Sequence, residues 1–274
     1  MPDELITSRQ NQRVRDAAKL RDRRAREKQG RTLIDGAREL DRAIRAGAAL
    51  LETFVCESLC TEHALQTLLP QIEQTEAVCS LVTPEVFEKL AFGQRAEGVV
   101  GIIRTPNRTL SDIDLPPQPV VAVLEGVEKP GNVGAVVRSA DAAAISAVIV
   151  ADGRTDLFNP AAIRASLGTI FSVPVAAATS RETWDWLVAH NLPIFAARPE
   201  ASISYTDVDW RSGGSIILGS EAAGLSDRWL GDDGLGDRVT PIGLPMRGTA
   251  DSLNVSATAA VLFYEALRQR DANN

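Results

Sequence analysis

The feature that most constrains the fold is a series of apolar runs in the second half of the chain, separated by segments with helical spacing. Val120–Leu124 and Ala147–Ala151 contain only apolar residues, which is typical of strands that are covered on both faces. Ser215–Leu218 continues this series. Asn159–Leu167 and Arg181–Asn191 have the spacing of helices and lie between such runs. The alternation predicts a doubly wound α/β domain with an open, mostly parallel sheet.

The first third of the chain alternates in the same way on a smaller scale. The expected elements are a basic helix (Asn11–Gln29), a strand (Thr32–Ile34), a helix (Gly36–Ala46), a strand (Thr53–Cys56), a helix (Glu62–Leu69), a strand (Ala77–Leu81), a helix after Pro84 and a strand (Val99–Ile103). They predict a small α/β sandwich without catalytic candidates. A proline-rich stretch follows and is typical of a linker. We therefore expect a recognition domain over residues 1–104, a linker over 105–118 and the larger α/β domain over 119–274.

Charge is divided unevenly along the chain. The whole sequence carries a net charge of −7, yet residues 1–50 contain thirteen Lys/Arg and eight Asp/Glu. Between Arg9 and Arg31 there are ten basic and three acidic residues. Such a segment in an acidic protein is either a solvated helix face or a surface that contacts phosphates, and the charge pattern favours neither strongly. The phosphate-binding candidates are Arg9, Arg13, Arg15, Lys19, Arg23 and Arg24.

Composition also bears on the compartment and on metals. No apolar run approaches the length of a membrane helix, and the N-terminus lacks the pattern of a secretory signal. Three cysteines in a long chain fit a reducing cytoplasm better than a disulfide framework. Cys56, Cys60 and His63 have no fourth ligand nearby, so no structural zinc site is expected.

Polar residues follow the first strand of the larger domain. Gly131, Asn132 and Gly134 are expected to form a turn that opens a helix, and Arg138 lies in that helix among small and apolar residues. The start of such a helix could bind an anion. Alternatively, Arg138 is an ordinary surface residue.

A second polar candidate follows a later strand. Glu221 lies between Gly219 and Gly224, at the end of a strand where open α/β sheets bind ligands. Alternatively, Glu221 caps a helix that begins near Leu225.

The third candidate segment precedes the C-terminal helix. Ser252, Asn254 and Ser256 alternate just before an apolar helical pattern, and either Asp251 or Ser252 is expected to be its N-cap. One cap needs one such residue, so three indicate a further role. No dinucleotide or Walker-A motif is present, and neither histidine lies in a promising loop, which disfavours a histidine-based nucleophilic mechanism.

Together, these segments resemble the three ordered motifs of the SpoU (TrmH-like) RNA 2′-O-ribose methyltransferases of the SPOUT superfamily. They read E-G-V-E-K-P-G-N-V-G-A-V-V-R-S-A-D-A-A, I-I-L-G-S-E-A-A-G-L and L-P-M-R-G-T-A-D-S-L-N-V-S-A-T-A-A. The resemblance covers residues 120–270. At the front, I-T-S-R-Q-N-Q-R-V-R and L-I-D-G-A-R-E-L resemble the substrate-binding domain, similar to ribosomal protein L30e, of the ribosomal-RNA-directed members.

The resemblance implies a deep trefoil knot in the C-terminal domain and a bound S-adenosylmethionine (SAM). Carried over by position, the cofactor contacts fall on Gly219, Leu244 and Leu253, with Leu218, Ile242 and Asn254 as neighbours. It also implies a homodimer whose active site receives residues from both chains. Metal is not implied.

The resemblance further implies roles for the polar residues. Asn132 and Arg138 would act at the ribose hydroxyl, and Glu221, Ser252 and Asn254 would orient the arginine and the ribose. A guanidinium keeps its proton up to a pKa above about 12, so we expect Arg138 to steer the RNA while a substrate phosphate accepts the proton. The expected function is methylation of ribosomal RNA of the large-subunit, 23S type. The alternatives are a tRNA 2′-O-methyltransferase and a non-catalytic RNA-binding assembly factor.

Overall fold

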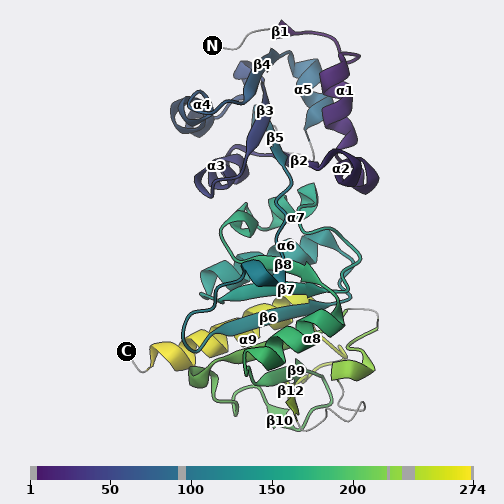
Figure 1. Cartoon of the computed structure of the whole chain (residues 1–274), viewed down its shortest axis with the longest axis vertical. Coiled ribbons are helices and arrows are strands. Elements are labelled where there is room, and N and C mark those ends of the chain that lie inside the picture. Colours follow the sequence, from purple (N-terminus) through teal and green to yellow (C-terminus); the bar gives the residue numbers. More distant parts are fainter. Residues whose placement is uncertain (1–4, 92–96, 221–222, 230–237, 273–274) are drawn as a thin grey trace. The chain divides into compact units, whose positions relative to one another are not determined.

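The computed structural model describes residues 5–91, 97–220, 223–229 and 238–272, and the chain folds into two compact units, each with its own sheet (Figure 1). The first unit comprises residues 1–107 and 158–172. The second comprises residues 108–157 and 173–274. Residues 158–172 thus pack with the first unit, although we expected them in the larger domain.

Side-chain contacts explain why residues 158–172 belong to the first unit. The Thr32 hydroxyl donates a hydrogen bond of 2.7 Å to the carbonyl oxygen of Phe158. Arg164 forms an ion pair of 3.0 Å with Asp35, whose side chain is almost fully buried. Sequence periodicity could not reveal these contacts, because they join residues more than 120 positions apart.

A five-stranded sheet in the order β1-β4-β3-β5-β2 forms the centre of the first unit. The strands are β1 (Leu5–Ile6), β2 (Arg31–Asp35), β3 (Leu50–Val55), β4 (Val78–Val82) and β5 (Val99–Arg104). The helices are α1 (Gln12–Lys19), α2 (Arg23–Gln29), α3 (Ala37–Arg45), α4 (Leu69–Ile72), α5 (Pro84–Leu90) and α7 (Pro160–Ala165). Strand β5 runs antiparallel to β2 and β3. Figure 1 shows α1, α2 and α5 on one side of this sheet and α3 and α4 on the other, so the small α/β domain is confirmed.

The predicted basic helix over Asn11–Gln29 is wrong in one respect, because it is two helices. Asp22 interrupts it: the Asp22 carboxylate accepts a hydrogen bond of 3.1 Å from the backbone N–H of Ala25 and caps α2. Arg26 is 3% exposed and donates to the carbonyl oxygens of Leu20 and Arg21, both at 2.8 Å. One cation of the basic run is therefore used to join α1 to α2.

A seven-stranded sheet in the order β10-β12-β9-β11-β6-β7-β8 forms the centre of the second unit, and every pair in it is parallel. The strands are β6 (Val120–Glu125), β7 (Ala147–Ala151), β8 (Val175–Ala178), β9 (Ile194–Ala197), β10 (Ile203–Ser204), β11 (Gly214–Leu218) and β12 (Val239–Gly243). The helices are α6 (Pro130–Ala142), α8 (Ser180–Ala189) and α9 (Val255–Asp271). The predicted parallel α/β fold is confirmed. The trefoil knot stays a prediction.

The apolar runs are buried because helices cover both faces of this sheet. Val121 and Val123 of β6 share a core cluster with Trp184 and Leu187 of α8. Helices α6 and α9 pack against each other, and their inward residues include Val136 and Phe263, both fully buried. Among the described residues, no helix has both the length and the apolar character needed to cross a membrane.

Two local expectations in this unit are wrong. The N-cap of α9 is Asn254, and not Asp251 or Ser252, so the helix begins later than expected. Gly131 and Asn132 do not form a turn before α6; they lie in its first turn, because Pro130 begins the helix.

Candidate active site

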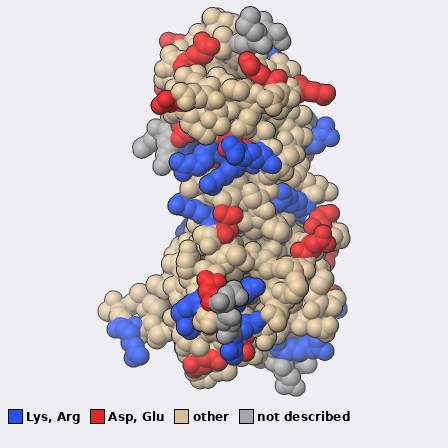
Figure 2. All heavy atoms as spheres, turned by 90° about the vertical axis from the view of Figure 1, so that its left-hand side faces the viewer, with Lys and Arg blue, Asp and Glu red and all other residues tan. Residues whose placement is uncertain are grey.

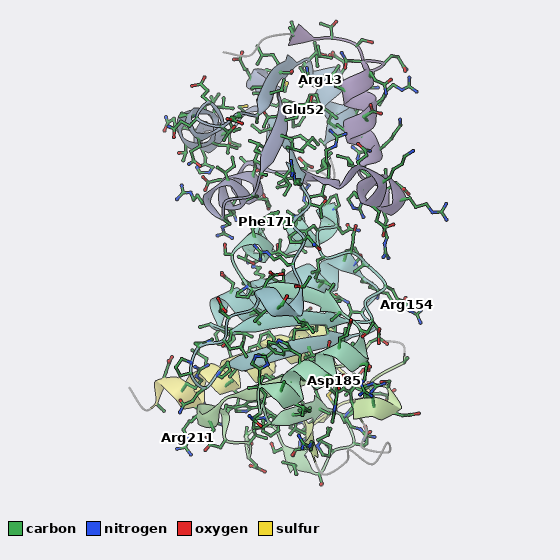
Figure 3. The ribbon with its side chains drawn as sticks, viewed as in Figure 1. Arg13, Glu52, Arg154, Phe171, Asp185 and Arg211 are labelled. Carbon is green, nitrogen blue, oxygen red and sulfur yellow. The ribbon has the colours of Figure 1, made fainter. Side chains whose placement is uncertain are left out.

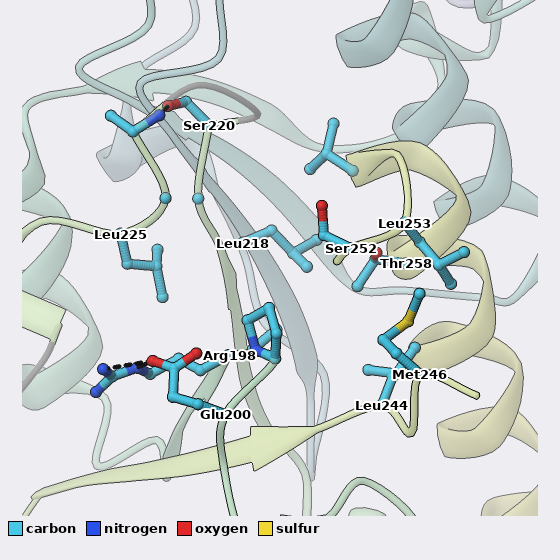
Figure 4. Close-up of a pocket in the computed structure, with 16 residues that line it drawn as sticks. Arg198, Glu200, Leu218, Ser220, Leu225, Leu244, Met246, Ser252, Leu253 and Thr258 are labelled. Atoms are coloured by element: carbon cyan, nitrogen blue, oxygen red, sulfur yellow. Dashed lines mark hydrogen bonds and ion pairs between the residues drawn. The ribbon is translucent and has the colours of Figure 1, made fainter. Parts of the chain in front are cut away.

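A cavity of about 320 Å³ opens at the carboxyl ends of the central strands of the second unit (Figure 4). It is lined by Ala197, Arg198, Pro199, Glu200, Leu218, Gly219, Ser220, Ala223, Gly224, Leu225, Leu244, Met246, Ser252, Leu253, Val255 and Thr258. These residues come from the ends of β9, β11 and β12 and from the start of α9. This is the edge at which open parallel sheets bind their ligands.

Four of the six expected cofactor residues line this cavity. They are Leu218, Gly219, Leu244 and Leu253. Ile242 lies in β12, is fully buried and is not among the lining residues that the structure describes. Sequence positions scattered over 36 residues are thus brought into one pocket by the sheet order.

Gly219 lies where the chain passes closely against itself. A Cβ atom at this position would lie 2.3 Å from the carbonyl carbon of Gly224, well inside contact distance. The loop is closed by two backbone hydrogen bonds between Ser220 and Gly224, of 3.1 and 3.0 Å. Glu221, an expected catalytic residue in this loop, lies outside the described residues.

Ser252 and Asn254 stand at the start of α9 in different roles. Ser252 lines the cavity. Asn254 does not, because its side-chain oxygen accepts hydrogen bonds from the backbone N–H of Ser256 at 2.9 Å and from the Ser256 hydroxyl at 2.6 Å. Asn254 therefore holds the first turn of the helix whose residues Val255 and Thr258 reach the cavity.

Asn132 and Arg138, expected at the ribose hydroxyl, both lie on α6. Asn132 is half-buried in the first turn, and Arg138 is exposed more than one turn further along. Neither belongs to the cavity lining among the described residues. Within one chain the structure does not bring Arg138 together with Ser252 in this cavity.

The sequence analysis missed a charged pair at the cavity. Arg198 and Glu200 follow β9 and form an ion pair of 2.6 Å, visible in Figure 4. A hydrogen bond from its own backbone N–H, followed by the bond from Arg198, lowers the pKa of the Glu200 carboxyl below its ordinary value. The pair could have been found from its place after a strand at the ligand-binding edge. Met246 and Thr258 were also missed.

The basic residues of the first unit differ in their surroundings. Arg13 pairs with Glu52 at 2.5 Å, as Figure 3 shows, and lies over the ring of Phe54. Other ion pairs are Arg9 with Glu88, Lys19 with Asp16 at 3.0 Å, and Arg23 with Glu27 at 2.7 Å. Arg15 and Arg24 are exposed. Acidic partners thus neutralise part of the run, and Figure 2 shows positive and negative side chains mixed on the face that it displays.

The cysteines do not gather at a metal centre among the residues that the structure describes, which contain no cluster of three or more His, Cys, Asp or Glu suited to a metal ion. Cys56 is buried, and the Cys60 thiol lies 3.6 Å from the carbonyl oxygen of Gly98. Burial raises the pKa of the Cys60 thiol to about 11.

The fold and the cavity define an α/β protein that binds a small ligand at the carboxyl edge of a parallel sheet and carries a second, smaller α/β unit. Residues 119–264 match the SpoU rRNA Methylase family, and residues 11–101 match the MRM3-like substrate binding domain. The first match covers more than half of the chain. The chain belongs to the SpoU rRNA methylase family, which confirms the predicted family and its RNA methyltransferase activity.

Relatives agree over nearly the full length. A 23S rRNA guanosine 2′-O-methyltransferase of Bacillus subtilis, RlmP, is 27% identical over 259 residues, covering 94% of this chain and 97% of that protein. A crystal structure of an RNA 2′-O ribose methyltransferase is 41% identical, with a TM-score of 0.83 and coverage of 97% and 99%. The SpoU methyltransferase AviRb of Streptomyces viridochromogenes, in complex with the cofactor AdoMet, is 26% identical, with a TM-score of 0.84 and coverage of 96% and 99%.

Proposed function

We propose that the chain transfers a methyl group from SAM to a ribose 2′-hydroxyl of ribosomal RNA of the large-subunit, 23S type. One observation carries the proposal: Leu218, Gly219, Leu244 and Leu253, which come from two separate motifs, line one cavity. The AdoMet complex of AviRb and the 23S rRNA activity of RlmP support the same cofactor and substrate.

The cavity residues fit this cofactor in size and chemistry. A volume of about 320 Å³ is within the range of about 300–1,000 Å³ that small-molecule sites occupy. Leu218, Leu244 and Leu253 supply apolar walls for an adenine ring, and the Arg198–Glu200 pair supplies a polar end for the rest of the cofactor. We place Ile242 and Asn254 as support, Ile242 behind the wall in β12 and Asn254 at the start of α9.

The chemistry then needs mainly positioning and deprotonation by the chain's own residues. The bound cofactor supplies a methyl group on a positively charged sulfonium. In this proposal Asn132 donates a hydrogen bond to the ribose hydroxyl, and Arg138 steers the RNA by pairing with a phosphate that accepts the hydroxyl proton. Ser252 and Glu221 orient the ribose and the arginine.

We infer that this site is completed by a second copy of the chain. Arg138 is exposed on α6 and outside the cavity lining of its own chain. The outer face of α9 exposes the apolar side chains of Val261 and Tyr264, by 38% and 52%, and Leu253 precedes it at 42%. Exposed apolar groups of this size mark an interaction surface, which supports a homodimer.

RNA recognition is assigned to the first unit in this proposal. Arg15 and Arg24 are exposed on α1 and α2, and they are the strongest phosphate contacts of the basic run. Arg9, Arg13, Lys19 and Arg23 would exchange a carboxylate partner for a phosphate. Ribosomal RNA as substrate also implies a cytoplasmic protein.

The test is incubation of the purified protein with labelled SAM and ribosomal RNA, followed by nuclease digestion to nucleosides. The expected product is a labelled 2′-O-methylnucleoside. Label found only in base-methylated nucleosides would contradict the proposal. Label in tRNA but not in ribosomal RNA would favour the tRNA enzyme, and binding of SAM without transfer to any RNA would favour the assembly factor.

The dimer has a separate test. Arg138→Ala and Ser252→Ala variants, each inactive alone, are mixed after reversible dissociation. Recovery of part of the activity is expected, because a mixed dimer retains one site with both residues intact. No recovery in dimers shown by native mass spectrometry to be mixed would contradict a shared site.

A further inference from the structure

We propose that Glu125 is a positioning residue that sets the cofactor wall of the active site from behind. The inference rests on the proposed function of the cavity and deepens it. Glu125 is the last residue of β6, is 6% exposed and does not belong to the described cavity lining. A carboxylate in such a place needs hydrogen-bond donors around it, since an unsatisfied buried charge is strongly destabilising.

The donors around Glu125 come from two other parts of the unit. Oε1 accepts hydrogen bonds from the Ser180 hydroxyl at 2.9 Å, the Ser226 hydroxyl at 2.7 Å and the Trp229 indole N–H at 2.8 Å. Oε2 accepts a bond of 2.7 Å from the Ser226 backbone N–H. Four bonds therefore join the end of β6 to the start of α8 and to the segment that follows β11.

That segment is the wall of the cavity. Gly224 and Leu225 line the cavity, and Ser226 is the next residue along the chain. Trp229, three residues further, is fully buried, and its ring centroid lies 5.6 Å from that of Trp184 on α8. The wall is thus held on its outer side by one carboxylate and one packed indole.

A carboxylate suits this position better than its amide analogue. The Trp229 indole N–H and the Ser226 backbone N–H can only donate, and they address different oxygens of Glu125. A glutamine has one acceptor oxygen, so its NH₂ group would face one of these donors in either orientation. The Glu125→Gln variant keeps the size of the side chain and must lose at least one bond to the wall.

The function of this arrangement is pre-organisation of the cofactor site. Binding to a site whose wall is already ordered avoids the cost of ordering that wall. Loss of the Glu125 bonds should therefore weaken cofactor binding while RNA binding and the chemical step stay nearly unchanged.

The experiment measures SAM affinity by isothermal titration calorimetry on the full chain, together with the KM for RNA and kcat at saturating SAM. Glu125→Gln is expected to raise the Kd for SAM about tenfold, a typical effect for a lost bond to a charged group. The KM for RNA and kcat should stay within about twofold of wild type. An unchanged Kd in the folded variant would overturn the proposal.

A matched control separates positioning from stability. Ser215 is fully buried on β11 at the opposite end from the cavity, and its hydroxyl donates a bond of 3.0 Å to the carbonyl oxygen of Pro193. Ser215→Ala should lower Tm and leave the Kd for SAM unchanged. If Glu125→Gln behaves in the same way, Glu125 is only structural and the proposal is wrong.

A second variant covers failure of Glu125→Gln to fold. Ser226→Ala removes one hydroxyl donor and keeps the backbone bond, so a Kd increase of about threefold is expected. An unchanged Kd in this variant would then overturn the proposal. Wild-type protein that binds no SAM would instead contradict the proposed function, so the two failures are distinguishable.

Discussion

Single residues at this site act through close approach as much as through chemistry. Gly219 shows this directly, because the space for a side chain is occupied by the backbone of Gly224. Its importance could be expected from the motif, but its physical reason depends on a loop closure that spacing does not show. Asn254 is similar: the motif predicts a polar residue there, and the structure shows that it caps α9.

Gly219→Ala should lower both SAM affinity and stability, because the added methyl group lies 2.3 Å from a backbone atom that cannot move alone. Calorimetry and thermal unfolding measure the two effects. Gly131→Ala is the matched control, since nothing lies within 4 Å of its added Cβ atom. Equal SAM affinity in both variants would contradict the steric account.

Asn254→Ala should destabilise the second unit by about 1 kcal/mol through loss of the α9 cap. Asn254→Asp should keep most of this stability, since aspartate is an equally good N-cap. Urea unfolding of the three proteins measures this. A loss in Asn254→Asp as large as in Asn254→Ala would show that the amide, and not the cap, is responsible.

Cys60 gives a pH dependence whose sign follows from its raised pKa. Its thiol ionises near 9.0 in the unfolded chain and at about 11 when folded, chiefly because of burial. Its contribution to stability is therefore complete below pH 9 and is lost as the pH rises towards 11. The urea midpoint of Cys60→Ala should fall less between pH 8.5 and 10.5 than that of wild type. Equal slopes would contradict this.

At the scale of elements, the basic run shows how charge patterns mix structural and functional residues. Sequence spacing predicted a single helix, but the chain uses Asp22 to end one helix and begin another, and it buries Arg26 between them. A count of basic residues cannot distinguish such a cation from Arg15 or Arg24, which are exposed. Only the tertiary contacts do.

Variants of these three arginines should therefore separate. Arg15→Ala and Arg24→Ala should weaken RNA binding, reduce its salt dependence by up to about 0.9 per phosphate contact, and leave Tm unchanged. Arg26→Ala should lower Tm, because two carbonyl oxygens lose a charged donor. Filter binding at several salt concentrations and thermal unfolding measure these effects. A drop in Tm for Arg15→Ala equal to that for Arg26→Ala would contradict the assignment.

At the scale of the whole molecule, the parallel sheet was predictable because Val120–Leu124 and Ala147–Ala151 are apolar throughout. The cavity was predictable in part, from motifs that mark Leu218, Gly219, Leu244 and Leu253. The packing of residues 158–172 with the first unit and the Glu125 hydrogen bonds were not, because long-range contacts between ordinary residues leave no periodic signal.

The most direct test of the account is to map 2′-O-methylated positions on ribosomal RNA from cells with and without this protein, by resistance of the RNA backbone to alkaline cleavage. The account predicts that a specific position of the 23S-type RNA loses its protection when the protein is absent and regains it with the wild-type chain but not with Arg138→Ala. Identical protection patterns with and without the protein would contradict the assignment of ribosomal RNA as its substrate.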